Sequence, residues 1–237
     1  MFELRIRPFV VGRMLVCLFA VLLLAHIAVV VLRLEFGRDY LYGLALRFDF
    51  DRPISAPDWF TGVLFLAAAL SSAMCGLATG HGWERGYWFG ISGILAFLSF
   101  DEVASIHAYV ATLFGQPAFV GWTLIYAPAV GLLAVGALPL LLRLPRPTAV
   151  GLVVSGLLFT FGAVAMEWFG ASIAEAATGT PVAEMTKTQW TEVKNTWPYV
   201  ASAMLEESFE MCALILYVVT ALTYVSRQKV EFRLSFG

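Results

Sequence analysis

The sequence is poor in cysteine and in charged residues. Its 237 residues include three cysteines, Cys17, Cys75 and Cys212, each inside a long apolar run and none in a Cys-x-x-Cys pair. This spacing argues against a disulfide framework or a thiolate metal site, so the cysteines are expected to pack as small hydrophobic side chains. Charged residues make up only 14% of the chain and the net charge is −2. The chain therefore lacks the basic excess that would attract nucleic acid.

Several catalytic motifs are also missing. No serine lies in a Gly-x-Ser-x-Gly nucleophile elbow, and no glycine-rich phosphate loop is present. The chain has no Glu-x-x-His motif, which the di-iron sites of ferritin-like bundles use. It also has no internal repeat, so residues 1–237 are expected to form a single transmembrane domain.

What the sequence does contain is hydrophobic. Apolar residues make up 60% of the chain, and the mean hydropathy is +0.81. Ordinary globular domains are roughly 45–50% apolar, so the composition indicates a polytopic membrane protein whose first partner is the lipid bilayer. A helix needs about 20 apolar residues to cross the hydrocarbon core. The sequence predicts an all-α integral membrane bundle of six transmembrane helices, at about 10–33, 58–79, 87–114, 118–143, 148–177 and 196–225.

The positions of the basic residues predict the orientation of the chain in the membrane. If the N-terminus is inside, the cytoplasmic segments carry more Lys and Arg than the outer segments, as the positive-inside rule requires. We therefore expect both termini in the cytoplasm, in a multi-pass protein of the bacterial inner (plasma) membrane. Residues 34–57 mix aromatic and charged residues, which is typical of an interfacial loop. The polar residues 178–195 are expected to form a cap on the outer face.

Seven carboxylates lie inside the third, fifth and sixth predicted spans, and those spans contain no Lys or Arg to neutralise them. A charged residue at the centre of a lipid-exposed helix costs about 2.5–3.5 kcal/mol, so these groups need protons, a histidine, water or a metal cation. Glu175 lies close to the outer end of its span and is expected to be solvated. The seven residues are Asp101, Glu102, Glu167, Glu175, Glu206, Glu207 and Glu210.

Helical spacing and depth predict that most of these acids meet. Glu206, Glu207 and Glu210 occupy an arc of about 100° on a regular helix. The other acids, together with His26 and His107, fall at similar depths when the spans are drawn across the bilayer. Carboxylates with one or two imidazoles are the usual ligands of iron or manganese, and zinc also accepts them. The sequence therefore predicts a divalent metal site, with iron, manganese or zinc bound by Glu102, His107, Glu167, Glu207 and Glu210, and with Asp101, Glu206 and His26 as additional candidates.

One geometric condition limits this site. Glu102 and His107 stand about 140° apart on a regular helix, so both can face one metal only if the helix is locally irregular.

Two resemblances can be stated from these segments. The segment EESFE at 206–210 is similar to the Arg-Glu-Gly-Leu-Glu motif of the high-affinity iron permeases, with Glu206 in place of the Arg and Ser208 in place of the Gly. That resemblance implies an intramembrane acidic pair that handles iron, although the motif occurs once here and twice in the permeases. The segments FDFDRPISAPDWF, FLSFDEVASIH and EESFEM together resemble an uncharacterised family of bacterial polytopic membrane proteins, with no assigned activity, over most of the chain.

Three other functions fit the same residues. A proton or cation pathway would use membrane carboxylates, but the cytoplasmic halves of these helices are almost wholly apolar and show no inner exit. A structural subunit of a larger membrane complex would keep the acids protonated, as burial favours. A metal-dependent enzyme acting on a lipid or quinone-like substrate would use the remaining acids to transfer protons. A homo-oligomer or a membrane complex is compatible with each of these functions.

Overall fold

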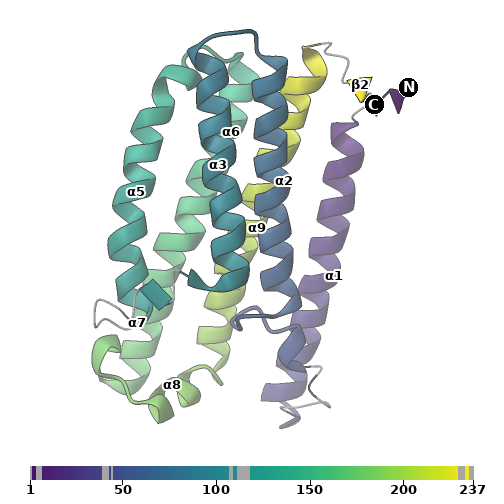
Figure 1. Ribbon diagram of the computed structural model, residues 1–237. Coiled ribbons are helices and arrows are strands. Elements are labelled where there is room, and N and C mark those ends of the chain that lie inside the picture. Colours follow the sequence, from purple (N-terminus) through teal and green to yellow (C-terminus); the bar gives the residue numbers. More distant parts are fainter. Residues whose placement is uncertain are drawn as a thin grey trace.

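The chain folds as a bundle of long helices that run side by side (Figure 1). The computed structural model describes residues 2–3, 7–38, 43, 45–106, 109–110, 118–228 and 233–234. The all-α prediction is confirmed for these residues. The long helices are α1 (Pro8–Leu34), α2 (Ala56–Ala78), α3 (Trp83–Ala104), α5 (Ala118–Leu141), α6 (Arg146–Thr160), α7 (Glu167–Thr178) and α9 (Trp197–Arg227). The short elements are β1 (Phe2–Glu3), η2 (Ala45–Arg47), η3 (Phe161–Met166), η4 (Val182–Glu184), α8 (Lys187–Val193) and β2 (Arg233–Leu234).

Four helical segments are long and apolar enough to cross a membrane. They are α1, α2, the continuous segment Arg146–Thr178 that joins α6 to α7, and α9. Only 17% of the apolar stretch of α1 and 22% of that of Arg146–Thr178 is buried inside the protein, against 61% for α2 and 56% for α9. Apolar faces of this extent are stable only when lipid covers them, because several hundred Å² of hydrocarbon would otherwise be exposed to water. The helices α2 and α9 form the centre of the bundle.

The helix ends follow local sequence signals. The Ser55 hydroxyl accepts a hydrogen bond from the Asp58 amide at 3.2 Å and so caps the first turn of α2, where Pro57 also sits. At α8, Thr186 and Gln189 form a reciprocal capping box. Helix α3 ends at Ala104, and Ser105 takes a left-handed conformation with φ +51°, so the third predicted span is irregular at this point. Residues 107–108 and 111–114 of that predicted span lie outside the described residues.

The fifth apolar segment contains a π-helical turn, η3, between α6 and α7. A π turn holds one residue more than an α turn and rotates the following helix. Gly162 lies in this turn against α9, and a Cβ at this position would come within 3.0 Å of the Glu206 carbonyl oxygen and of the Glu210 side chain. Glycine therefore permits the close approach that brings the start of α7 to the acidic residues of α9.

The segment before α2 packs into the bundle. The Phe50 side chain, 3% exposed, joins a core of aromatic and aliphatic residues contributed by α2 and α9. The buried Phe50 side chain therefore anchors this part of the predicted interfacial loop in the bundle. Residues 39–42 and 44 of the same loop lie outside the described residues. The core around Phe50 contains Phe60, Leu64, Phe65, Met211, Leu214 and Ile215.

The two ends of the bundle differ. Strands β1 and β2 pair antiparallel and bring the chain termini together at one end, where the α2–α3 and α5–α6 connections also lie (Figure 1). The opposite end carries the loop before α2 and the α8 segment. Val182 of η4 and Val193 of α8 are buried against Ala174 of α7, so residues 178–195 form a packed cap.

Candidate functional site

The carboxyl groups of α9 lie in the half of the bundle that is remote from the termini. Glu206 belongs to the face of α9 that packs against η3 and α7, as shown by the contact of its carbonyl oxygen with Gly162. Glu206 is hydrogen-bonded to Glu167, the first residue of α7. A hydrogen bond between two carboxyl groups needs a proton on one of them. This pair therefore holds at least one proton in the arrangement described.

Glu207 and Glu210 connect that pair to α3 and to the loop before α2. The electrostatic neighbours of Glu210 are Glu102 of α3 and Glu167 of α7. The electrostatic neighbours of Glu207 are Glu210, Glu102, Asp58 and Asp51. All of these neighbours are acidic. The structure thus brings together five of the acids singled out in the sequence, which we call the acidic cluster: Glu102, Glu167, Glu206, Glu207 and Glu210.

A buried hydroxyl lies next to this cluster. Ser202 precedes Glu206 by one turn of α9 and is 2% exposed. Its Oγ lies 3.4 Å from the position that a Cβ on Gly170 would take, so it faces α7 one turn beyond Glu167. Among the described residues this oxygen has no hydrogen-bond partner. Buried polar atoms are nearly always satisfied, so the α7–α9 interface beside the acid pair is suited to a further polar group or ion.

The structure places the remaining candidate residues elsewhere. Asp101 is buried and hydrogen-bonded to Tyr126 of α5, so it faces away from its neighbour Glu102. Glu175 accepts a hydrogen bond from the Val182 amide at 3.0 Å and ties the end of α7 to the cap. His107 lies outside the described residues.

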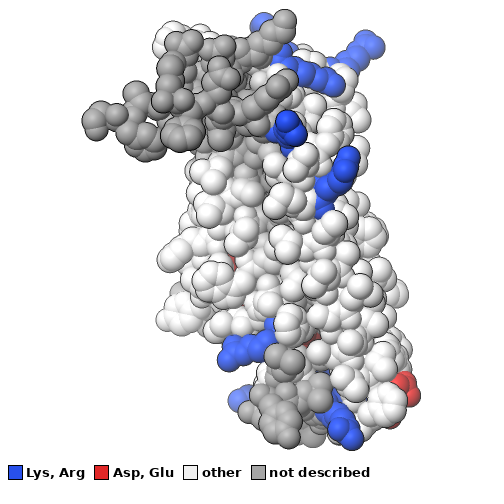
Figure 2. All heavy atoms as spheres, turned by 90° about the vertical axis from the view of Figure 1, so that its right-hand side faces the viewer, with Lys and Arg blue, Asp and Glu red and all other residues white. Residues whose placement is uncertain are grey.

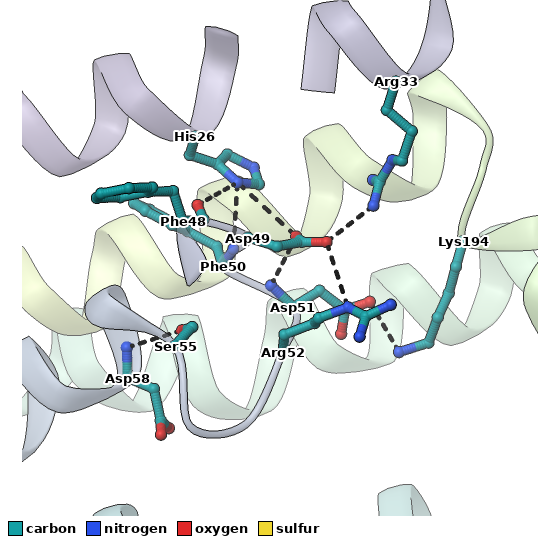
Figure 3. Close-up of polar contacts among 10 residues, drawn as sticks. All are labelled: His26, Arg33, Phe48, Asp49, Phe50, Asp51, Arg52, Ser55, Asp58 and Lys194. Carbon is teal, nitrogen blue, oxygen red and sulfur yellow. Dashed lines mark hydrogen bonds and ion pairs between the residues drawn. The ribbon is translucent and has the colours of Figure 1, made fainter. Parts of the chain in front are cut away.

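His26 contacts the loop before α2 (Figure 3). Its ring stacks on Phe50, and its Nδ1 accepts a hydrogen bond from the Phe50 amide at 3.1 Å. The same nitrogen lies 3.3 Å from the Phe48 carbonyl oxygen, so it accepts from the Phe50 amide when it carries no proton and can donate to Phe48 when it carries one. Equal depth in the membrane suggested that His26 joins the metal ligands, but the ring is directed to this loop by Phe50 and by Asp49, whose Oδ1 lies 3.8 Å from Nδ1.

Two carboxylates of the loop before α2 are functional candidates that the sequence analysis did not single out. Asp49 is 4% exposed and accepts a hydrogen bond from Arg33 at 2.8 Å, with Arg52 4.0 Å away. Asp51 accepts one from Lys194 at 2.8 Å (Figure 3). Burial raises the pKa of Asp51 above its ordinary value, and the nearby Lys194 lowers it by a smaller amount.

The described residues do not form a ready metal site. Within the described parts of the chain, no three His, Cys, Asp or Glu side chains are close enough to hold one ion as they lie. The acidic cluster supplies oxygen ligands of the type that manganese, iron and zinc accept. Binding a metal there requires the carboxyl groups to lose their shared proton and to rotate toward a common point.

A family model described as a domain of unknown function, DUF8692, matches residues 14–225. The chain belongs to this family. The DUF8692 match includes the whole acidic cluster and reaches from α1 into α9. The family description assigns no activity, in agreement with the resemblance to an uncharacterised family. No curated protein and no solved structure matches the chain.

Proposed function

We propose that this DUF8692 protein is an integral membrane protein that binds a divalent metal cation in its acidic cluster and releases protons as it does so. The observation that carries this proposal is the convergence of five carboxyl groups from α3, α7 and α9, in which Glu207 and Glu210 have other carboxyl groups as electrostatic neighbours. Repulsion among neighbouring carboxylates is relieved by protons or by other cations. Protons supply this charge in the metal-free state, and a divalent ion supplies it when bound.

The proposed topology has six membrane spans and cytoplasmic termini. Helices α3 and α5 run alongside the four candidate spans, which supports the count of six (Figure 1). On the face that carries α1, basic side chains gather toward the two ends and leave a white region between them (Figure 2). The acidic cluster then lies in the outer half of the bilayer, where cations arrive from outside the cell. We propose the bacterial inner membrane as its location.

The proposed metal ligands are the acids that face one another across α3, α7 and α9. Glu207 and Glu210 are central because each has charged neighbours on α3. Glu206 holds the proton shared with Glu167 and is suited to exchange it. His107 follows the end of α3 and is the proposed nitrogen ligand. The proposed first set is therefore Glu102, His107, Glu167, Glu207 and Glu210.

The test is the metal content of the protein purified in detergent without chelator. We expect near-stoichiometric manganese, iron or zinc in the wild type, and its loss in a Glu207→Gln, Glu210→Gln double variant, because amides do not supply anionic oxygen. Glu192→Gln on α8 is the matched control, since Glu192 is exposed. Absence of metal from the wild type, even after incubation with each ion, contradicts the proposal.

A proton pathway is the second candidate, and one observation favours it. The hydroxyls of Ser72 and Tyr217 are hydrogen-bonded at 2.7 Å in the half of the bundle nearer the termini. Tyr217 follows Glu210 by two turns of α9, and helical side chains lean toward the N-terminus, so its hydroxyl leans toward the cluster. In vesicles containing a pH dye, Tyr217→Phe slows proton uptake if this pathway operates and leaves it unchanged if it does not.

A further inference from the structure

An ion pair joins two distant segments at the outer end of the bundle. Lys194, at the end of α8, donates a hydrogen bond to Asp51, in the loop before α2, at 2.8 Å. Both side chains are in contact with solvent, at 43% and 32% exposed. In Figure 3 the lysine reaches down to the Asp51 carboxylate, while Arg33 and Arg52 are directed to Asp49. Lys194 is therefore the basic group that neutralises Asp51.

This ion pair lies at the solvent-facing border of the acidic cluster. Asp51 is one of the electrostatic neighbours of Glu207, as is Asp58. On the other side, the Lys194 ammonium lies 5.9 Å from the centre of the Tyr199 ring. Tyr199 has Asp51, Glu167 and Glu206 among its electrostatic neighbours. Carboxyl groups thus follow one another from Asp51, which solvent reaches, to the buried residues of α9.

A buried hydroxyl oxygen lies beside the acidic cluster. The Oγ of Ser202 is buried and faces α7 beside the Glu167–Glu206 pair, and it has no hydrogen-bond partner among the residues that the structure describes. A cation that arrives there finds oxygen ligands of two kinds. The outermost carboxylate of this series already binds a cation, which is the ammonium group of the chain itself.

We propose that Asp51 is the first carboxylate to bind a metal cation that arrives from the outer side, and that Lys194 is the cation which the metal displaces. This inference rests on the proposed metal-binding function. A divalent ion neutralises Asp51 and the neighbouring acids more effectively than one ammonium group. The displaced Lys194 side chain is long and flexible and is solvated on the exposed surface of the cap.

Competition between Lys194 and the metal predicts the direction in which the metal affinity changes when Lys194 is removed, and a purely structural ion pair predicts a different direction. If Lys194 only holds the cap to the loop, its removal lowers stability and leaves the metal affinity unchanged or weaker. If Lys194 competes with the metal, its removal strengthens binding, because the arriving ion no longer displaces a positive charge. Replacement of Lys194 by arginine should weaken metal binding, since a guanidinium group pairs with a carboxylate through two hydrogen bonds.

The experiment measures Mn²⁺ binding to the full chain in detergent at low ionic strength. We expect Lys194→Gln to bind Mn²⁺ about three- to tenfold more tightly than the wild type and Lys194→Arg to bind it more weakly. Asp51→Asn should weaken binding several-fold. Lys187→Gln, on the exposed surface of the same helix, is the matched control and should change the affinity little. The gain in Lys194→Gln should shrink in about 0.5 M salt, which screens the charge.

Two results would overturn the inference while the proposed function stands. In the first, the wild type binds Mn²⁺ and Lys194→Gln binds it equally or more weakly. In the second, Lys187→Gln raises the affinity as much as Lys194→Gln does, which would make the effect a general change of surface charge. If the wild type binds neither Mn²⁺ nor another divalent ion, the proposed function itself fails and this inference fails with it. Lys194→Arg, which keeps the charge, provides the comparison if Lys194→Gln does not fold.

Discussion

At the scale of single residues, small side chains and loop acids decide the geometry of the cluster. Glu206 reaches Glu167 only because Gly162 has no side chain between the two helices. Asp51 is held at the border of the cluster by its ion pair with Lys194. Spacing along α9 predicted that Glu206, Glu207 and Glu210 share a side, but no sequence pattern specified which glycine allows the approach.

A Gly162→Ala substitution should destabilise the protein by about 1–3 kcal/mol, because the new methyl group overpacks the α7–α9 contact. It should also reduce metal binding by moving Glu167 away from Glu206. Gly156→Ala is the matched control, since a Cβ there has open space around it and alanine favours the helix. Thermal unfolding of both variants in detergent checks this expectation. Equal stability of the two variants contradicts the packing account.

The titration of Asp51 should leave a signature in the stability of the protein. Because burial raises the pKa of Asp51 in the folded state, the folded protein retains a proton that the unfolded chain releases. Stability from this group is therefore lost as the pH rises from the ordinary pKa of 3.8 through the folded value. Relative to Asp51→Asn, the wild type should become less stable as the pH rises above 3.8. If the wild type instead gains stability as the pH rises, the ion pair with Lys194 lowers the pKa of Asp51 by more than burial raises it.

At the scale of elements, the π turn and the end of α3 position the site. Hydropathy predicted one continuous fifth span without the π turn inside it, because the hydropathy of a segment does not distinguish an α turn from a π turn. It also predicted that the third span continues past Ala104, where the structure has Ser105 in a left-handed conformation. Depth placed His26 with the ligands, but depth carries no information about which way a side chain faces. The ring packs on Phe50 instead.

Insertion of one alanine after Ala165 should rotate α7 by about 100° relative to α6, because η3 already holds one residue more than an α turn. Glu167 would then leave Glu206, and we expect the purified variant to lose most of its metal. Insertion of one alanine after Gly131 in α5, where a Cβ has open space around it, is a control for the general effect of lengthening a helix. Full metal content in the Ala165 insertion would show that the π turn does not position a ligand.

At the scale of the whole molecule, the sequence was sufficient for the class of fold. Long apolar runs separated by charged turns specify membrane helices, because an apolar run of that length is stable only in lipid or in a protein core. The acidic cluster could be predicted too, because a small set of helices limits where intramembrane acids can go. The folding of residues 45–55 into the bundle could not, since it depends on the packing of Phe50 among side chains of α1, α2 and α9, which only the assembled bundle brings together.

The proposed topology predicts which surfaces are accessible from each side of the membrane. In a variant without natural cysteines, a Lys187→Cys substitution on α8 should react with an impermeant maleimide in intact cells. A Gln228→Cys substitution at the end of α9 should react only after permeabilisation. The reverse pattern would place the acidic cluster in the cytoplasmic half and the termini outside.

The measurement that tests the central claim most directly counts protons released when Mn²⁺ binds to the purified wild type. Titration calorimetry in buffers of different ionisation enthalpy gives this number together with the stoichiometry. We predict one metal ion per chain and a net release of protons, both lost in the Glu207→Gln, Glu210→Gln double variant. Absence of binding, or binding that the double variant retains in full, would contradict a metal site built from the acids of α9.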